Sequence, residues 1–411
     1  MKSGAATSDR PLQPSDVFSW YLERDPALRV PVVLIAELDR EPDELALRAR
    51  TEAALRTVPQ LSEVVVEAPW RLAPPRWTRV AEVDLDWHLR RVAVASPATE
   101  DALLELARLE ATTPFDTKRP MWTLTVVHGL PEGRAALLLR FHHSLTDGVG
   151  GVALAAEIFD LERQPSRDDT PLEPLPAARE HPLLDALVEQ TRTVALGAPG
   201  TTARMLHETF RSVAHPRNSA RTVASIARTV APVRRPVSPL LVDRGIGRSL
   251  HVVDLALPEF HAAARAQGVT VNDALLAGVA RGVRRYHERH GQQLQMIRVT
   301  MPVDLRRPSD PPGGNRITLM RFLIPTGGAD VGRHLRGVRV VAQRQRLERS
   351  LPHTQGIARA LAFLPPAVVG SMLKHVEALV SDVPGPPVPP CTRPAPASPV
   401  GTSSAPRPAL R

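Results

Sequence analysis

The sequence predicts an α/β protein in which helix-like and strand-like segments occur on both sides of a polar segment. Short apolar runs typical of strands recur between stretches whose apolar residues follow the helical period. A chain of 411 residues with 43% hydrophobic content can build one large domain or two ordinary ones. Residues 164–182, rich in Pro, Asp and Arg, are typical of a linker. We therefore expect strands and helices both before and after that linker.

The first half alternates between the two element types. Leu45 and Leu109 are among the apolar residues whose helical spacing predicts that they face the core. The expected helices are residues 16–22, 43–58, 99–112 and 152–161, and the expected strands are residues 30–38, 64–70, 77–83, 122–127 and 135–141.

Helix-like and strand-like segments occur again after the basic segment that follows the linker. Leu275, Leu276, Val279 and Val283 give one long helix an apolar side. The expected helices are residues 258–267, 272–290, 330–351 and 360–380, and the expected strands are residues 249–257, 297–303 and 316–324.

These patterns divide the chain into four parts. Residues 1–163 form an N-terminal subdomain, residues 164–248 a basic connecting segment, and residues 249–386 a C-terminal subdomain. Residues 387–411 follow as a tail. Ten of the 30 residues from 382 to 411 are proline, which predicts disorder there.

The net charge of +9 comes almost entirely from arginines spread along the chain, since only three residues are lysine. Aromatic residues are not interleaved with them for base stacking, which disfavours nucleic-acid binding. A general attraction to anionic membrane surfaces fits better. Residues 202–235, with seven arginines and one acidic residue, predict either a solvated helical connector or a basic surface on lipid headgroups.

Cellular context follows from what the sequence lacks. Cys391 is the single cysteine, which excludes an intrachain disulfide and a cysteine-based zinc site. The first ten residues lack the apolar core of a signal peptide, and no run of about 18 apolar residues could span a membrane. We expect a cytoplasmic protein, either soluble or peripheral on the inner membrane face or on lipid inclusions.

One loop combines the residue types that acid–base chemistry needs. A strand-like run leads into residues 142–148, His-His-Ser-Leu-Thr-Asp-Gly, and a helix-like run follows them. Strand-to-helix loops are where α/β proteins place reactive groups. A histidine can remove a proton near neutral pH. Asp147 can lock a sharp turn or meet a buried arginine, and Gly148 permits an approach that a Cβ would block.

Two other interpretations of this loop are a purely structural histidine at a strand end and a metal site. Adjacent residues on a strand point to opposite faces, so His142 and His143 cannot easily share one ion. This favours an inward, structural His142 and an outward His143 that acts as general base, without a metal.

Further segments occur in a specific order around this loop. Residues 119–122 read Arg-Pro-Met-Trp, residues 271–274 read Val-Asn-Asp-Ala, and residues 381–386 read Ser-Asp-Val-Pro-Gly-Pro. Residues 301–306, Met-Pro-Val-Asp-Leu-Arg, precede Gly-Asn at 314–315. Together with HHxxxDG, these segments resemble the bacterial wax ester synthase/acyl-CoA:diacylglycerol acyltransferase family. The resemblance runs from about residue 11 to residue 386.

That resemblance implies two chloramphenicol-acetyltransferase-like subdomains with mixed sheets and flanking helices, and an active-site tunnel between them. It also implies an O-acyltransferase that needs no cofactor, takes acyl-CoA as co-substrate, and acylates diacylglycerol or a long-chain alcohol. His143 would remove the proton of the acceptor hydroxyl. His142 and Asp147 would hold the loop, and Gly148 would leave space for the thioester. The substrate-binding residues it implies are Pro120, Trp122, Asn272, Asp273, Arg306 and Asn315.

Several of these residues also have a plain structural interpretation. Asn272 and Asp273 could cap the helix that they open, and Trp122 could belong to the core. Arg306 could pair with Asp147 or lie at the surface, and Asn315 suits a turn.

Two departures from the family pattern affect the C-terminal half. Asp382 stands where the family has Asn, and sequence rich in Pro, Ser and Arg replaces the strands and helix that usually follow. We expect a frameshift or a truncation, with an incomplete second subdomain. The excess of Arg over Lys, together with the high Ala, Pro and Val content, indicates a GC-rich genome, which suits a lipid-storing actinobacterium and favours diacylglycerol as the acceptor. The alternatives are an acyltransferase for another hydroxyl or amine, and a catalytically impaired, lipid-associated homologue.

Overall fold

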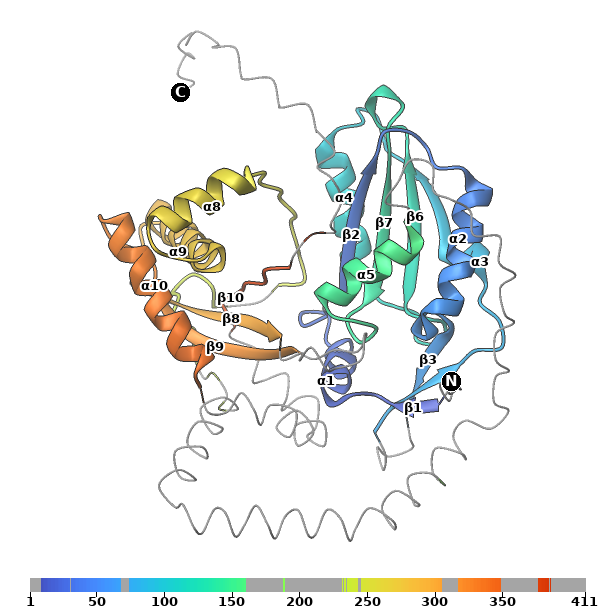
Figure 1. Cartoon of the computed structure of the whole chain (residues 1–411), viewed down its shortest axis with the longest axis horizontal. Helices are drawn as coiled ribbons and strands as arrows, with labels where there is room; N and C mark the ends of the chain where they lie inside the picture. The colour runs from blue at the N-terminus through green and yellow to red at the C-terminus, as the bar shows by residue number, and fades with distance from the viewer. Residues whose placement is uncertain are drawn as a thin grey trace, which may run out of the picture.

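The computed structural model describes residues 9–29, 31–67, 74–159, 188, 231, 233, 235–242, 245–304, 317–348, 376–383 and 385. These residues form an α/β structure with mixed sheets, as the sequence predicts. The elements from β1 to α5 form one body and those from α8 to β10 form a second (Figure 1). The linker at 164–182, most of the basic segment at 202–235 and the tail at 387–411 lie outside the described residues.

A four-stranded sheet with the order β2-β7-β6-β5 is the centre of the N-terminal body. β7 pairs antiparallel with both of its neighbours, and β5 runs parallel to β6. Every residue of β7 is buried, so this strand lies in the middle of the body and delivers its last residue, His142, into the interior. The strands are β2 (Pro31–Leu38), β5 (Leu89–Ala93), β6 (Trp122–His128) and β7 (Ala135–His142).

Helices cover this sheet, and four of them begin with a side-chain cap. Asp43 accepts a hydrogen bond from Ala46 N at 2.8 Å, Asp84 accepts one from Trp87 N at 3.2 Å, and Thr99 accepts one from Ala102 N at 3.2 Å. Asp147 caps the fourth helix, α5. The helices are α1 (Pro14–Leu22), α2 (Glu44–Thr57), α3 (Leu85–His88), α4 (Glu100–Thr112) and α5 (Gly148–Ile158).

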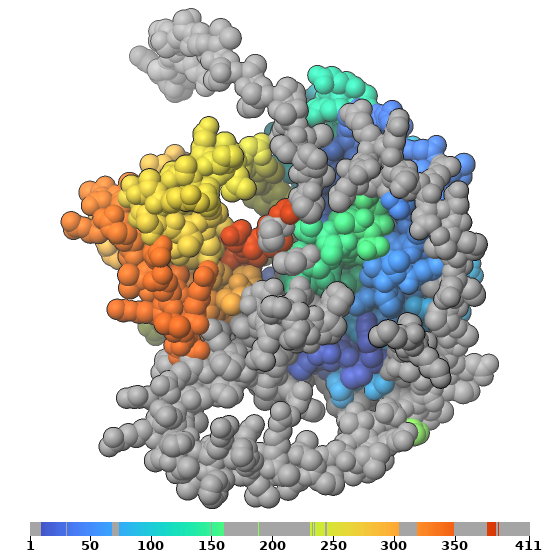
Figure 2. Space-filling view, viewed as in Figure 1, coloured from blue at the N-terminus to red at the C-terminus, as the bar shows by residue number. Residues whose placement is uncertain are grey.

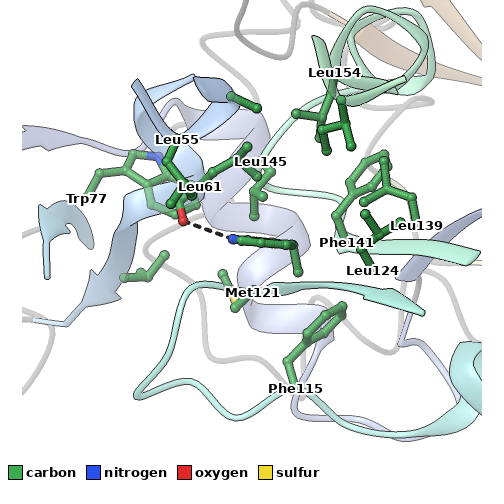
Figure 3. Packing of buried hydrophobic residues seen from close by; sticks show 14 of the residues in the cluster. Leu55, Leu61, Trp77, Phe115, Met121, Leu124, Leu139, Phe141, Leu145 and Leu154 are labelled. Atoms are coloured by element: carbon green, nitrogen blue, oxygen red, sulfur yellow. Dashed lines mark hydrogen bonds between the residues drawn. The ribbon is translucent and has the colours of Figure 1, made fainter. Parts of the chain in front are cut away.

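A second sheet of three strands lies beside the first, in the order β1-β4-β3, with both pairs antiparallel. Its strands are β1 (Asp9–Pro11), β3 (Glu63–Val66) and β4 (Arg76–Arg79). The core of the N-terminal body packs around Trp122, which is fully buried. Leu61, Met121, Phe141 and Leu145 converge there from four segments of the chain (Figure 3).

On two helices, one residue that was predicted to face the core is exposed instead. Leu45 is 77% exposed and Leu109 is 47% exposed, although both were expected to face the core. Thr51 and Ala107 are buried on those helices instead. Each helix buries only the side that packs against the rest of the body, so apolar residues outside that side face solvent.

The C-terminal body pairs a three-stranded sheet, in the order β10-β8-β9, with helices. β8 and β9 are antiparallel, and the short β10 runs parallel to β8. On α9, Leu276 is fully buried, and the predicted inward residues Leu275, Val279 and Val283 pack against the same cluster. The elements are α8 (Leu257–Ala266), α9 (Val271–Arg289), β8 (Met296–Asp304), β9 (Ile317–Pro325), α10 (Val331–Arg346) and β10 (Ala378–Leu379).

One carboxylate joins three parts of this body. Glu377, just before β10, accepts hydrogen bonds from the backbone N–H groups of Val237 and Ser238 and, at 2.8 Å, from Arg298 N on β8. A carboxylate that accepts several backbone N–H groups is held firmly because each bond is charge-assisted. Glu377 therefore fixes the chain that enters this body against the strand in its middle.

The strand predicted at 249–257 is wrong. These residues pair with no strand in the described part of the chain, and Val253 and Leu255 are 80% and 66% exposed. Apolar alternation specifies a strand only where a neighbour completes its hydrogen bonds. The helix predicted at 360–380 is also wrong at its end, because residues 378–379 form β10. Residues 360–375 lie outside the described residues.

None of the helices within the described residues combines the length and the apolar character that a membrane span requires.

Candidate functional site

The predicted catalytic loop begins where β7 ends. His142 N donates a hydrogen bond to Met121 O at 3.0 Å, and Leu145 N donates one to His142 O at 2.9 Å. The first bond ties the loop to the segment before β6, and the second closes a tight turn at 143–145. The Arg-Pro-Met-Trp segment therefore lies directly beside the histidine pair.

His142 points into the protein interior and is almost completely buried. Its Nδ1 accepts a hydrogen bond from Ser144 N at 3.1 Å and lies 2.7 Å from Ser144 Oγ. Because an N–H group donates to Nδ1, the proton of the neutral ring belongs on Nε2. Burial, with further contributions from His143 and Arg140, lowers the pKa of His142 to about 3. His142 is thus an uncharged, structural residue at neutral pH.

His143 begins the turn after β7 and is partly exposed. The structure thus buries His142 more deeply than His143. Burial lowers the pKa of His143, while its own backbone carbonyl and the Asp147 carboxylate act in the other direction. A lowered pKa keeps the imidazole in the unprotonated form that can accept a proton at neutral pH. Nδ1 of His143 is buried and makes no hydrogen bond to the described residues.

Asp147 ends the loop and starts α5. Its carboxylate accepts a hydrogen bond from Gly150 N at 2.9 Å, and its carbonyl accepts one from Gly151 N at 2.7 Å. The side chain therefore caps α5, which agrees with the predicted role of locking the turn.

Glycine is required at the start of α5 for reasons of space. A Cβ on Gly148 would lie 2.7 Å from Val383 Cγ2, and a Cβ on Gly151 would lie 2.7 Å from Phe141 Cζ. A Cβ on Gly150 would overlap Thr146 Oγ1. Val383 belongs to the Ser-Asp-Val-Pro-Gly-Pro segment, so the C-terminal half reaches the histidine loop at Gly148.

The figures show the same approach. The segment after β10 leaves the C-terminal body and runs toward the N-terminal one (Figure 1). On this face of the molecule its coloured atoms lie between the two bodies (Figure 2). Two motifs that are far apart in the sequence therefore meet at one place.

The other predicted residues of the N-terminal half are buried. Pro120 is buried next to Met121, and Trp122 is fully buried. The Trp122 indole N–H donates to Leu61 O at 2.9 Å, and the His88 ring stacks on the indole at a centroid distance of 4.2 Å. The structural interpretation of Trp122 is the one that the geometry supports, since no face of the indole is open to a substrate.

Asp273 and Asn272 have different roles on α9. Asp273 Oδ2 accepts from Thr270 N at 3.0 Å, and Thr270 Oγ1 accepts from Asp273 N at 3.1 Å, which is a capping box. The capping role considered for this pair therefore holds for Asp273, with Thr270 as the N-cap residue. Asn272 is partly exposed, and its amide donates to Met301 Sδ at 3.6 Å. Arg306 and Asn315 lie outside the described residues.

Three residues of this region were not singled out in the sequence. Ser144 and Val383 lie within the motifs described above, but no role was predicted for either residue. Glu23 follows α1, far from the loop in the sequence, and its carboxylate lies 3.7 Å from His142. No sequence pattern around Glu23 indicates that it lies near the histidine loop. Within the described residues, no group of three or more His, Cys, Asp or Glu side chains could hold a metal ion.

Comparison with known proteins identifies the family. The model of the wax ester synthase/diacylglycerol acyltransferase catalytic domain matches residues 12–275, and that of the C-terminal domain of the same family matches residues 313–396. The chain belongs to this family. A Mycobacterium tuberculosis H37Rv protein assigned as a diacylglycerol O-acyltransferase is 34% identical over 87% of this chain and 74% of its own length. A second from the same strain is 26% identical over 86% and 76%.

Members of the wax ester synthase/diacylglycerol acyltransferase family are acyltransferases, and so is this chain. Its fold is similar to that of the wax ester synthase/diacylglycerol acyltransferase from Marinobacter aquaeolei VT8, with a TM-score of 0.55, 19% identity, and coverage of 91% of this chain and 82% of that one. It is also similar to the first condensation domain of the calcium-dependent antibiotic synthetase, with a TM-score of 0.55, 17% identity, and coverage of 84% and 75%. The expected relation to the chloramphenicol-acetyltransferase-like folds is confirmed.

Proposed function

We propose that this chain transfers a long-chain acyl group from acyl-CoA to the hydroxyl group of diacylglycerol, with a long-chain alcohol as second acceptor. Family membership and the names of the mycobacterial relatives support this choice of acceptor and donor. The single observation that carries the mechanism is the histidine pair. One ring is buried and held by Ser144, and its neighbour is partly exposed with a lowered pKa.

In this mechanism His143 is the general base. Its unprotonated ring nitrogen takes the proton of the acceptor O–H while the oxygen attacks the thioester carbonyl. The C–S bond then breaks, and the departing CoA sulfur takes the proton back from His143, so that ester and CoA thiol leave and the enzyme is unchanged. A positioned general base contributes about 10²–10⁴ to the rate. No covalent acyl-enzyme is needed.

The remaining predicted residues support this step from a distance. His142 and Asp147 shape the turn that presents His143, and Gly148 keeps space between that turn and Val383. Pro120 and Trp122 hold the neighbouring backbone in the core. Asn272, whose side chain is partly exposed, is the residue of the Asn-Asp motif that is free to contact a substrate. Arg306 and Asn315 keep their predicted substrate-binding roles.

Both substrates carry long apolar chains, so we propose that the chain works at a peripheral membrane surface or a lipid-inclusion surface. The positive net charge of +9 would favour binding to anionic lipids.

The test measures release of CoA thiol by the purified full chain from palmitoyl-CoA with diacylglycerol, with hexadecanol, and with a panel of other alcohols and amines. We expect activity with diacylglycerol and a fall of about 10²–10⁴ in kcat for His143→Ala. His251→Ala, a change at an exposed histidine outside the loop, serves as the matched control. Equal activity of His143→Ala and the wild type would refute the mechanism. Activity with other acceptors alone, or with none, would favour one of the two alternatives.

A further inference from the structure

Glu23 is a buried carboxylate that no motif includes. It follows the last residue of α1 and is 8% exposed. Its Oε1 lies 2.9 Å from Arg29 Nε and accepts a hydrogen bond from Phe115 N at 3.4 Å. Burial raises the pKa of Glu23, and the Arg29 guanidinium is the largest influence in the other direction. Oε1 of Glu23 therefore has polar partners in Arg29 and Phe115.

The second oxygen faces the histidine loop. Glu23 Oε2 is buried, makes no hydrogen bond to the described residues, and lies 3.7 Å from His142 Nε2. Two aromatic rings contact the His142 ring edge-on, Trp20 at a centroid distance of 6.1 Å and Phe115 at 5.8 Å. Within the described residues, Ser144 thus faces Nδ1 of this imidazole and Glu23 faces Nε2.

The two ends of the ring require complementary hydrogen bonding. Ser144 N donates to Nδ1, so a neutral ring carries its proton on Nε2. An acceptor oxygen opposite Nε2 stabilises that tautomer and the ring orientation that goes with it. The Ser144 bond lies within the turn that Leu145 N closes on His142 O and that carries His143. The orientation of His142 therefore influences the position of His143.

We propose that Glu23 is a positioning residue for acyl transfer: its carboxylate holds His142 in the Nε2–H tautomer and so fixes the turn that carries His143. This proposal rests on the proposed function, in which His143 is the base.

Glu23→Gln tests the proposal with almost no change in side-chain shape. Arg29 and Phe115 both donate toward the Oε1 position, so the amide oxygen is held there and the NH₂ group faces His142 Nε2. A donor then stands where the ring needs an acceptor. Glu110→Gln is the matched control. Glu110 is a half-buried carboxylate whose buried Oε2 makes no hydrogen bond to the described residues and lies 3.6 Å from the buried Arg140.

Two measurements are made on the full chain. Steady-state kinetics with palmitoyl-CoA and diacylglycerol should show kcat reduced about 10–100-fold in Glu23→Gln. The KM for palmitoyl-CoA should stay within about threefold, and Glu110→Gln should keep kcat within about twofold. NMR of ¹⁵N-histidine-labelled protein should show the ring nitrogens of His142, assigned with His142→Gln, displaced in Glu23→Gln and unchanged in Glu110→Gln.

Unchanged His142 ring signals in Glu23→Gln would overturn the proposal, as would an equal loss of kcat in both variants. The ring signals report on the contact without reference to catalysis. Wild-type activity of His143→Ala would instead refute the proposed function, whatever Glu23→Gln does, so the two failures are distinguishable.

Discussion

Gly148 and Val383 lie so close together that a Cβ on the glycine would be 2.7 Å from Cγ2 of the valine. Gly148 begins the helix after the histidine loop, and Val383 belongs to the segment that follows β10. Gly148→Ala should force the two bodies apart at the loop, at a cost of about 1–3 kcal/mol from overpacking. We expect a fall in kcat of about tenfold or more from the displaced turn.

The double variant Gly148→Ala/Val383→Ala removes the colliding methyl groups and should recover most of the lost kcat. Gly278→Ala in α9, where a Cβ meets nothing within 4 Å, is the control and should leave kcat unchanged. Failure of the double variant to recover activity would show that Gly148 acts through something other than this contact.

The pH dependence of kcat/KM should follow the lowered pKa of His143. A base with a lowered pKa stays unprotonated at neutral pH and loses activity only as the pH falls through that pKa. We therefore expect kcat/KM to be level from pH 8 to about 6.5 and to fall below that value. Asp147→Asn keeps a capping acceptor but removes the charge that opposes the shift, so it should move the acidic limb to lower pH. A limb above pH 6.5 in the wild type would contradict this prediction.

Trp122→Phe should reduce stability more than chemistry. Phenylalanine cannot donate to Leu61 O, and a buried carbonyl that loses its donor costs about 1–3 kcal/mol. Urea unfolding should show this loss, while kcat and KM per folded molecule stay within about twofold. Trp87→Phe, at a partly exposed tryptophan nearby, should cost less. A several-fold rise in KM without a loss of stability would instead show that Trp122 contacts a substrate.

Stability should fall as the pH decreases below 6.5, because two buried histidines resist protonation. Burial lowers the pKa of His88 to about 4 and that of His142 to about 3. Between pH 6.5 and 4 the unfolded chain binds protons at these residues and the folded chain does not. Each therefore removes about 1.4 kcal/mol per pH unit. Urea unfolding of His88→Gln at pH 7 and pH 5 should show a smaller fall than the wild type. His251→Gln, at an exposed histidine, should match the wild type.

The sequence predicted most regular elements because their patterns are long. The helix around Leu276 and the paired strands before His142 have clear periodicity and were placed within a few residues. The elements that were missed are short: β1, α3, β5 and β10 span three, four, five and two residues, too few for a clear period to show. The predicted strand around Val253 failed because alternation says nothing about whether a partner strand is present.

The site shows the same division between local and distant information. The deeper burial of His142, the last residue of β7, and the partial exposure of His143 agree with the inward and outward positions that the sequence predicted from local alternation. The contacts of Glu23 with His142 and of Val383 with Gly148 join residues far apart in the chain. Such contacts depend on how the elements pack, which the residue pattern of one segment does not contain.

The hydrogen bonds to Glu377 have a consequence for the order in which the protein folds during synthesis. The central sheet of the N-terminal body needs nothing beyond β7, so it can form while the rest of the chain is still being made. β8 must wait for Glu377 and β10, which are translated after all the other described elements. Until then one edge of β8 is open, so we expect the nascent C-terminal half to depend on chaperones longer than the N-terminal half does.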